Sequence, residues 1–300
     1  MKAMRPPVGD IDWCTAFGHW GDIFVCCGVM KALMAHTGQE KVNVLYVGPD
    51  IAIVDWLELQ PFVGQVIGIK STEGDFYKKF WGATTQPNSE PETWLSLLRE
   101  QMRGLPKANQ YTCTHINSSW FETRTGLQAQ LWKGGILPQE SHLFAQDILR
   151  RTIPIRNGAV YHLHPVSTWS ESANNHWAHW LASIEWLVEK TPHTYVLTGL
   201  ENIPFCPKSP KLINLVGQTK SNLDVLAISQ ECDGVISTPN SVAIWSVIAG
   251  QKCLSIGNFA TQFLTSYYRR FLERGETMTY LNVDCTFSKF QAAACEFLEG

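Results

Sequence analysis

The chain has 300 residues, of which 45% are hydrophobic, and a formal charge of −3 at pH 7. A chain of this length can bury a substantial core and favours two domains of about 150 residues each. The isoelectric point near 6.3 excludes a global basic field of the kind that drives non-specific binding to nucleic acids or anionic membranes.

The first ten residues, MKAMRPPVGD, are followed by no uninterrupted apolar segment. We therefore expect neither a secretory signal nor a membrane anchor, and a cytoplasmic location. Nine cysteines are scattered along the chain without a CxxC pair or a zinc-like Cys/His spacing, which is typical of reduced thiols in a core.

Short strand-like runs alternate with helix-like stretches along the chain. The predicted strands are 11–15, 42–47, 63–69, 111–116, 159–163, 195–198, 234–236 and 252–256. The predicted helices are 21–35, 91–103, 177–189, 223–231, 241–249 and 288–298. This alternation predicts an α/β fold with parallel sheets built from βα units.

A domain boundary is expected where Pro, Asn and Gly interrupt the pattern at 153–158 (IPIRNG). The segment 74–91 is rich in turn formers and aromatic residues, which indicates a long loop inside the first domain. The expected domains are an N-terminal Rossmann-like domain over 1–155 and a C-terminal Rossmann-like domain over 156–285. A last helix, 286–300, is expected to pack back on either domain.

Ligands of parallel α/β sheets bind beyond the carboxyl ends of strands, where helix N-termini attract phosphate. The first candidate segment is 16–22 (AFGHWGD), between the opening strand and the first helix. Its two glycines allow a tight turn, and Asp22 falls near the start of the helix. Asp22 is then either a functional carboxylate or only a helix cap.

Two further polar segments follow predicted strands. The first, 164–169 (HPVSTW), continues through 174–177 (NNHW) into a helix. The second, 237–241 (STPNS), lies between a short strand and an apolar helix, where its hydroxyls and the helix-start amides either hold a diphosphate or cap the helix.

These segments, in this order, resemble the ADP-heptose:lipopolysaccharide heptosyltransferases and their relatives among the B-type glycosyltransferases. The segments that show this resemblance are Gly21-Asp22-Ile23, 175–177 (NHW), 195–199 (YVLTG), 214–219 (NLVGQT) and 234–250. The resemblance implies two Rossmann-like domains facing a cleft, the N-terminal domain taking the acceptor and the C-terminal domain the nucleotide-sugar. It covers roughly 10–35 and 159–257.

The sequence departs from the family at three positions. Asn175 stands where the family often has a lysine that neutralises donor phosphate, Pro239 where an Asp-containing turn is usual, and Ile244 where a histidine is frequent. The expected fold and reaction class do not depend on these three residues. The departures argue against heptose as the specific sugar of the donor.

The implied reaction is a direct displacement that inverts the anomeric carbon. Asp22 is the predicted general base that takes the acceptor proton, and His19 is a second candidate. Because the phosphate-binding positions offer hydroxyls and amides, no metal or other cofactor is expected. The early pair Asp10 and Asp12 superficially matches a metal-binding Asp-x-Asp and is interpreted as solvated carboxylates.

The remaining site residues divide by substrate. The donor-binding candidates are Thr168, Asn175, Thr198, Gly199, Gly217, Thr238, Asn240 and Ser241. The acceptor-binding candidates are Trp20, Lys78, Lys79, Trp81 and Trp120.

Three functions stay open. The first is an inverting, metal-independent transfer of a sugar to a glycan or lipid-linked saccharide. The second is a viral-type DNA glycosyltransferase acting on a hydroxymethylated base, which the lysines and aromatic residues between 64 and 133 would serve. The third is a sugar-nucleotide epimerase or a noncatalytic binding module.

Overall fold

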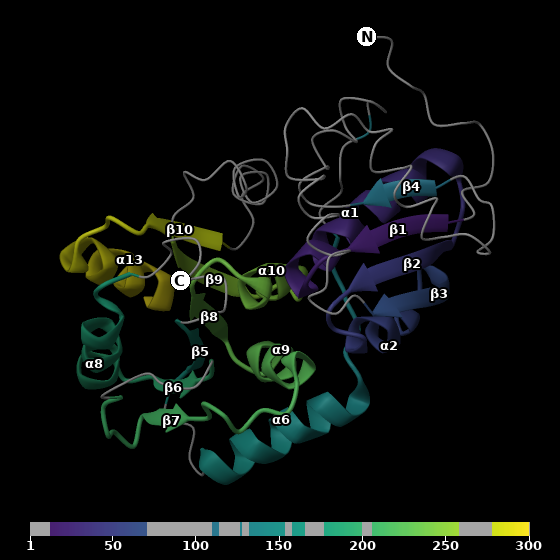
Figure 1. Cartoon of the computed structure of the whole chain (residues 1–300). Helices are drawn as coiled ribbons and strands as arrows, with labels where there is room; N and C mark the ends of the chain where they lie inside the picture. The colour runs from purple at the N-terminus through teal and green to yellow at the C-terminus, as the bar shows by residue number, and fades with distance from the viewer. Residues whose placement is uncertain are drawn as a thin grey trace. The chain divides into compact units, whose positions relative to one another are not determined.

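The computed structural model describes residues 13–70, 110–113, 127, 132–153, 158–165, 177–199, 206–257 and 278–299. The chain divides into two compact units, Met1–Trp132 and Lys133–Gly300 (Figure 1). Each unit is described by itself below.

The first unit is built on a parallel sheet in the order β3-β2-β1-β4. The strands are β1 (Trp13–Phe17), β2 (Val42–Gly48), β3 (Val63–Lys70) and β4 (Gln110–Cys113). Helix α1 (Trp20–Thr37) packs against β1 and β4, and α2 (Ala52–Glu58) packs against β3. Helix α1 ends at Thr37 and is capped by Gly38, whose φ of 73° is the left-handed conformation that glycine adopts without strain.

Aromatic rings fill the core beside α1. The Trp56 ring contacts Phe24 at 5.2 Å and Trp132 at 6.2 Å between centroids. The Trp132 indole also donates a 2.9 Å hydrogen bond to the carbonyl of Phe24. These tryptophans therefore act as core residues that satisfy or bury their own polar edge.

The second unit is built on a six-stranded parallel sheet in the order β10-β9-β8-β5-β6-β7. The strands are β5 (Val160–His164), β6 (Thr194–Leu197), β7 (Leu212–Asn214), β8 (Gly234–Ser237), β9 (Lys252–Gly257) and β10 (Met278–Asn282). Their hydrophobic runs are buried almost throughout, as expected for a parallel sheet that helices cover on both faces.

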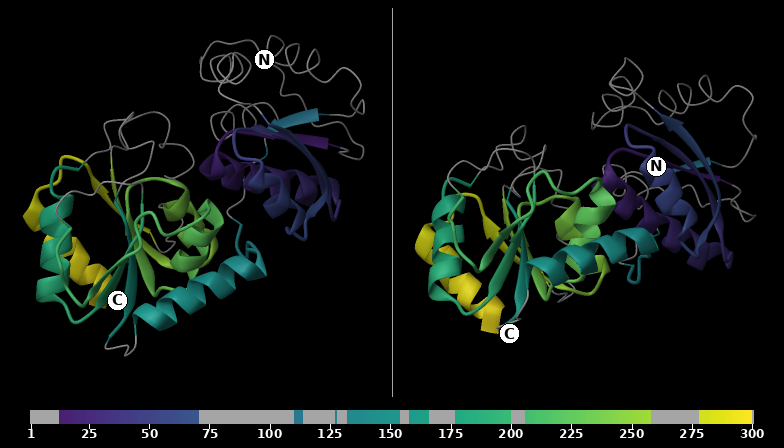
Figure 2. Two further views of the ribbon diagram at one scale, coloured as in Figure 1. Left: turned by 60° about the horizontal axis from the view of Figure 1, so that its bottom comes forward. Right: turned by 90° about the horizontal axis from the view of Figure 1, so that it is seen from below.

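Helices form a layer on each side of this sheet (Figure 2). On one side lie α8 (Trp180–Lys190) and α13 (Phe287–Glu299), whose side chains join the core around Tyr161 and Phe290. On the other lie α9 (Asn222–Gln230) and α10 (Ser241–Ile248). Helix α6 (Gln139–Thr152) packs against α9.

The division of the chain falls earlier than the boundary expected at 155. The first unit ends at Trp132 and the second begins at Lys133. Helix α6 lies with the second unit because it packs on α9, and its Gln146 side chain donates a 3.1 Å hydrogen bond to Glu231. Because this contact is made with a helix much later in the chain, the sequence around α6 does not show to which unit the helix belongs.

Most predicted elements agree with the structure to within a few residues, and the α/β fold class is confirmed. The sequence analysis gave no range for α2, α6, β7 or β10, and the predicted helix 91–103 lies outside the described residues. Of the described cysteines, Cys14, Cys26, Cys27, Cys232, Cys253 and Cys285 are buried free thiols.

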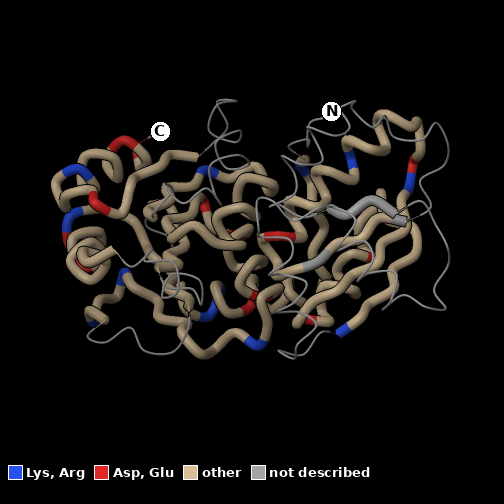
Figure 3. Tube along the Cα trace, turned by 45° about the horizontal axis from the view of Figure 1, so that its top comes forward, with Lys and Arg blue, Asp and Glu red and all other residues tan. Residues whose placement is uncertain are grey.

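Charged residues of both signs are interspersed along the described part of the trace (Figure 3). Within that part, no helix combines the length and the apolar character that crossing a membrane requires.

Candidate functional site

The strand order of the first sheet reverses at β1. From β1 the chain proceeds to β2 and β3 on one side, and β4 is added on the other side. In open parallel sheets ligands bind outside the carboxyl ends of the strands at such a reversal. The residues that follow β1, from Gly18 to Asp22, therefore occupy the switch point of this unit.

The turn after β1 depends on glycine and on the Asp22 carboxylate. Gly18 has a φ of 119°, and a Cβ atom there would collide with the Asp22 side chain. Asp22 lies in the first turn of α1, and its Oδ2 atom accepts the amide proton of His19 at 2.8 Å. The Tyr46 hydroxyl donates to the Gly18 carbonyl at 3.2 Å. These contacts fix a half-buried carboxylate and an exposed histidine at the switch point.

Trp20, predicted to contact the acceptor, is only 3% exposed. Its ring packs against Phe24 and Trp56 with centroid distances of 6.0 and 5.8 Å. Its indole donates a 2.7 Å hydrogen bond to Asp50, whose other oxygen accepts the amide proton of Ala52. In this structure Trp20 ties the start of α1 to the loop after β2, and its faces are covered by the core.

The second sheet has its switch point between β5 and β8. From β5 the chain proceeds to β6 and β7 on one side, and β8 is then added on the other. The Thr238 amide donates to the His164 carbonyl at 3.2 Å, so the two strand ends stay paired up to this point. The predicted turn of Thr238, Asn240 and Ser241 thus lies at the position where a ligand of this unit is expected.

Asn240 caps α10 from this turn. Its Oδ1 atom accepts the amide protons of Val242 at 2.8 Å and Ala243 at 3.1 Å, and its Nδ2 atom donates to the buried Thr238 hydroxyl at 3.1 Å. Two of the helix-start amides that the sequence analysis offered to a diphosphate are therefore already satisfied. What α10 still offers an anion is its dipole and the half-buried Ser241.

Thr198 lies at the carboxyl end of β6 between two histidines of β5. Its hydroxyl oxygen is 2.6 Å from His162 Nε2 and 2.8 Å from His164 Nδ1. Burial lowers the pKa of His164 to about 4, and burial together with the neighbouring His164 lowers the pKa of His162 well below its usual value. Both rings are therefore neutral at pH 7. The sequence analysis missed this cluster; the alternation His-x-His in a buried strand beside a threonine-ended strand is the signal that would have found it.

The two glycines predicted to bind the donor lie in turns that favour glycine. Gly199 has a φ of 148° directly after Thr198, and Gly217 has a φ of 72° in the turn after β7. The Asn214 carboxamide holds that second turn by accepting the Val216 amide proton at 3.0 Å. Both glycines follow carboxyl ends of strands in the same sheet.

Several predicted residues cannot be placed in the fold. Thr168 and Asn175 of the donor set, and Lys78, Lys79, Trp81 and Trp120 of the acceptor set, lie outside the described residues, as do Asp10 and Asp12. Among the residues that are described, no group of three or more His, Cys, Asp or Glu side chains could hold a metal ion.

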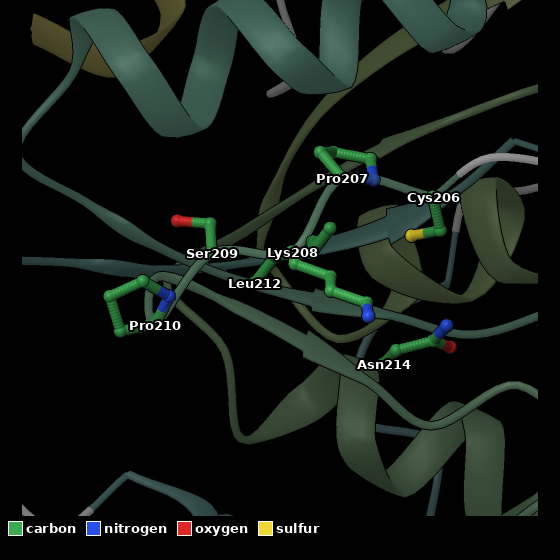
Figure 4. Close-up of a pocket in the computed structure, with 7 residues that line it drawn as sticks. All are labelled: Cys206, Pro207, Lys208, Ser209, Pro210, Leu212 and Asn214. Atoms are coloured by element: carbon green, nitrogen blue, oxygen red, sulfur yellow. The ribbon is translucent and has the colours of Figure 1, made fainter.

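A shallow open pocket of about 610 Å³ lies along the edge strand β7 (Figure 4). Cys206, Lys208, Ser209 and Asn214 are among the residues that line it. Figure 4 shows the Lys208 side chain extending toward Asn214. None of the predicted donor-binding residues lines this pocket, which is separate from the switch point at β5 and β8.

Two open parallel sheets, each with a polar turn at its switch point, define a Rossmann-like type of α/β protein. No protein-family model and no curated protein matches the chain. Solved structures do match it. The glycosyl transferase family 9 protein from Veillonella parvula DSM 2008 is similar over 96% of this chain and 90% of its own, with 12% identity and a TM-score of 0.64.

Two enzymes of E. coli give similar matches. ADP-heptose lps heptosyltransferase II matches over 96% of this chain and 98% of its own, with 11% identity and a TM-score of 0.59. Heptosyltransferase WaaC with ADP matches over 95% of this chain and 99% of its own, with 10% identity and a TM-score of 0.53. These likenesses establish a shared fold, and they confirm the resemblance to this group of glycosyltransferases.

Proposed function

We propose that the chain is an inverting, metal-independent glycosyltransferase that moves a sugar from a nucleotide-sugar to a hydroxyl of a glycan or lipid-linked saccharide. The observation that carries the proposal is a turn at the first switch point that presents a carboxylate, in a fold shared with glycosyltransferases over 96% of the chain. We place the activity in the cytoplasm as part of this proposal.

The second unit would bind the donor. The similar E. coli heptosyltransferase was solved with ADP, which makes a nucleoside diphosphate the first ligand to test. Thr238, Asn240 and Ser241 would lie near the diphosphate at the β5/β8 switch point, with Thr168 and Asn175 as further candidates. Thr198, Gly199 and Gly217 would shape the nucleoside side of the pocket.

Asp22 would act as the general base. Its carboxylate would take the proton of the acceptor hydroxyl while the oxygen forms a bond to the anomeric carbon. The bond from that carbon to the diphosphate oxygen would break, and the nucleoside diphosphate would leave with the electron pair. A single displacement of this kind inverts the anomeric configuration. His19, exposed beside Asp22, is the second candidate for the base.

Two acceptor classes, a saccharide and a modified DNA base, follow from the sequence. The basic and aromatic side chains that would serve a DNA acceptor, Lys78, Lys79, Trp81 and Trp120, lie outside the described residues. No described feature favours DNA over a saccharide, so the saccharide acceptor is the one proposed.

The proposal can be tested with a panel of nucleotide-sugars incubated with the protein, once alone and once with saccharide acceptors. A transferase should release nucleoside diphosphate in step with the new glycoside. Alteration of the donor without an acceptor would indicate an epimerase instead. An intact donor under every condition, despite saturable binding, would leave a binding module.

A further inference from the structure

His162 and His164, which form a buried cluster with Thr198, have no role in the reaction as proposed so far. The strand register places His164 beside the residue after Leu197, so the Thr198 hydroxyl lies between the two imidazole rings of β5. The side chains of His162 and Thr198 are fully buried, while His164, at the end of the strand, is half-buried. A buried polar cluster must distribute its protons so that few donors are left unsatisfied.

The Thr198 hydroxyl has a single proton, which couples the tautomers of the two histidines. In one arrangement His162 Nε2–H donates to Thr198, and Thr198 donates to His164 Nδ1. In the other arrangement His164 Nδ1–H donates to Thr198, and Thr198 donates to His162 Nε2. The hydroxyl oxygen could also accept from both rings, but its proton would then need another acceptor, and the described residues offer the Thr198 hydroxyl no partner besides the two rings. Fixing either ring therefore fixes the other.

The surroundings of His162 decide between the two arrangements. Its Nδ1 atom is buried and has no hydrogen-bond partner in the described structure. The second arrangement would put a proton on that atom and leave a buried N–H without an acceptor, and such orphaned donors are rare in folded proteins. The first arrangement leaves only a lone pair there, and it gives both rings the Nε2–H tautomer that neutral imidazole side chains favour in water.

The first arrangement has a consequence at the switch point. His164 is the last residue of β5, and its carbonyl pairs with the Thr238 amide, directly beside the turn that leads into α10. With Nδ1 held by Thr198, the ring can offer only its Nε2–H to a ligand. Within the described residues this atom has no hydrogen-bond partner and is not among the fully buried unpartnered polar atoms.

We propose that Thr198 and His162 lock His164 in the tautomer that donates its Nε2–H to a phosphate oxygen of a nucleoside diphosphate. The inference rests on the proposed function, because it names a positioning pair and a ligand-contacting residue of the donor site. It assigns Thr198 a task different from lining the nucleoside pocket. Since burial keeps the pKa of His164 near 4, the ring donates as a neutral group at physiological pH.

Two isosteric substitutions separate the two sides of the His164 ring. The oxygen of the side chain in His164→Asn replaces Nδ1 and keeps an acceptor for Thr198, but the ligand-facing donor is lost. The terminal amide in His164→Gln replaces Nε2 and keeps a donor there. Calorimetric titration with ADP, UDP and GDP should show at least about 10-fold weaker binding for H164N, the usual worth of a hydrogen bond to a charged group, and a smaller loss for H164Q.

The exposed His179, which precedes α8, supplies the matched control, and H179N should bind as the wild type does. Thr198→Val should weaken binding although it leaves His164 in place, because the tautomer is then no longer fixed. If the wild type binds a nucleoside diphosphate and H164N binds it equally well, the inference is overturned while the proposed function stands.

Nitrogen-15 NMR of the ring nitrogens tests the lock without any substitution and decides the matter if a variant fails to fold. Both histidines should carry their proton on Nε2 in the wild type, and addition of the bound nucleoside diphosphate should shift the Nε2 resonance of His164 more than that of His162. A proton on Nδ1 of either ring would overturn the lock. If the wild type binds none of the three nucleotides, the ligand assignment fails together with the proposed function.

Discussion

Helix α1 and helix α10 both begin at a switch point, and they satisfy their first amides in different ways. At α1 the negatively charged Asp22 carboxylate accepts the amide proton of His19. At α10 the neutral Asn240 carboxamide accepts two, those of Val242 and Ala243. A carboxylate partly neutralises the helix dipole, whereas a carboxamide leaves it in place.

The difference assigns different chemistry to the two helix starts. An anionic helix start repels a phosphate, but its carboxylate can accept a proton from a substrate hydroxyl, as a general base does. A neutral helix start keeps its attraction for an anion, which suits a diphosphate. The four predictions that follow challenge this contrast or sharpen it.

The largest effect is expected at Asp22. Asp22→Asn should lower turnover by about 10²-fold or more, because the amide cannot take a proton while its oxygen still caps His19. Nucleoside diphosphate affinity should stay the same. Initial rates with a nucleotide-sugar measure the loss, and Asp55→Asn, an exposed acidic residue in the first turn of α2, is the matched control. Full activity of D22N would remove Asp22 from the mechanism.

The next effect concerns the neutral histidines beside α10. A folded-state pKa below the unfolded value means that the unfolded state binds more protons as pH falls through 6.5, so stability declines toward pH 4. The decline is about 1.4 kcal/mol per pH unit for each histidine that stays neutral. Urea unfolding at pH 6.5 and pH 5 should show the wild type losing about 1.5 kcal/mol more than H164Q over that interval, because the unfolded imidazole is already half protonated at pH 6.5.

The exposed His36 of α1 provides the comparison. His36→Gln should leave the pH dependence as in the wild type. A wild type and an H164Q variant with equal pH dependence would contradict a neutral His164.

A third effect is structural and lies at the Asp22 turn. Gly18→Ala should lower the free energy of unfolding by roughly 1–3 kcal/mol, since a Cβ at φ 119° is strained and meets the Asp22 carboxylate. Gly38→Ala, at φ 73° with open space around the added atom, should cost about 1 kcal/mol. Chemical denaturation compares the two. Equal losses of unfolding free energy in the two variants would show that the Asp22 side chain moves away from the added Cβ at no cost.

The smallest expected effects come from the cap of α10. Asn240→Ala should cost about 1 kcal/mol of stability, comparable to Ser221→Ala at the start of α9, where the serine caps Asp224. Asn240→Asp should keep the cap but add a negative charge, so it should weaken nucleoside diphosphate binding several-fold at low salt with little change in stability. Unchanged affinity in N240D would mean that no anion approaches α10.

The fold was largely predictable because its strands are short buried runs separated by polar turns. Val42–Gly48 and Lys252–Gly257 were found to within one residue on this basis. The missed α2 is only seven residues long. In β10 only Met278 and Leu281 are buried, three positions apart, and this pattern does not show the alternation of a strand. Local periodicity carries little signal in elements this short.

The site was less predictable because its contacts join distant parts of the chain. The Gly18 to Asp22 turn is local, and the sequence places it at the start of α1. The contact of Thr198 with His162 and His164 spans 36 and 34 residues and depends on strand order. Likewise, the sequence does not show that Trp56 and Asp50 surround the Trp20 ring. The burial of Trp20 was therefore not foreseen, and the residue was predicted to contact the acceptor.

The most direct test of the central claim is the anomeric configuration of the product, determined by proton NMR after transfer in excess chelator. The account predicts a glycoside of the configuration opposite to that of the donor, formed at an undiminished rate without free metal. A product with retained configuration would contradict a single displacement with Asp22 as the base. Loss of transfer in chelator, restored by magnesium or manganese, would contradict the metal-independent mechanism.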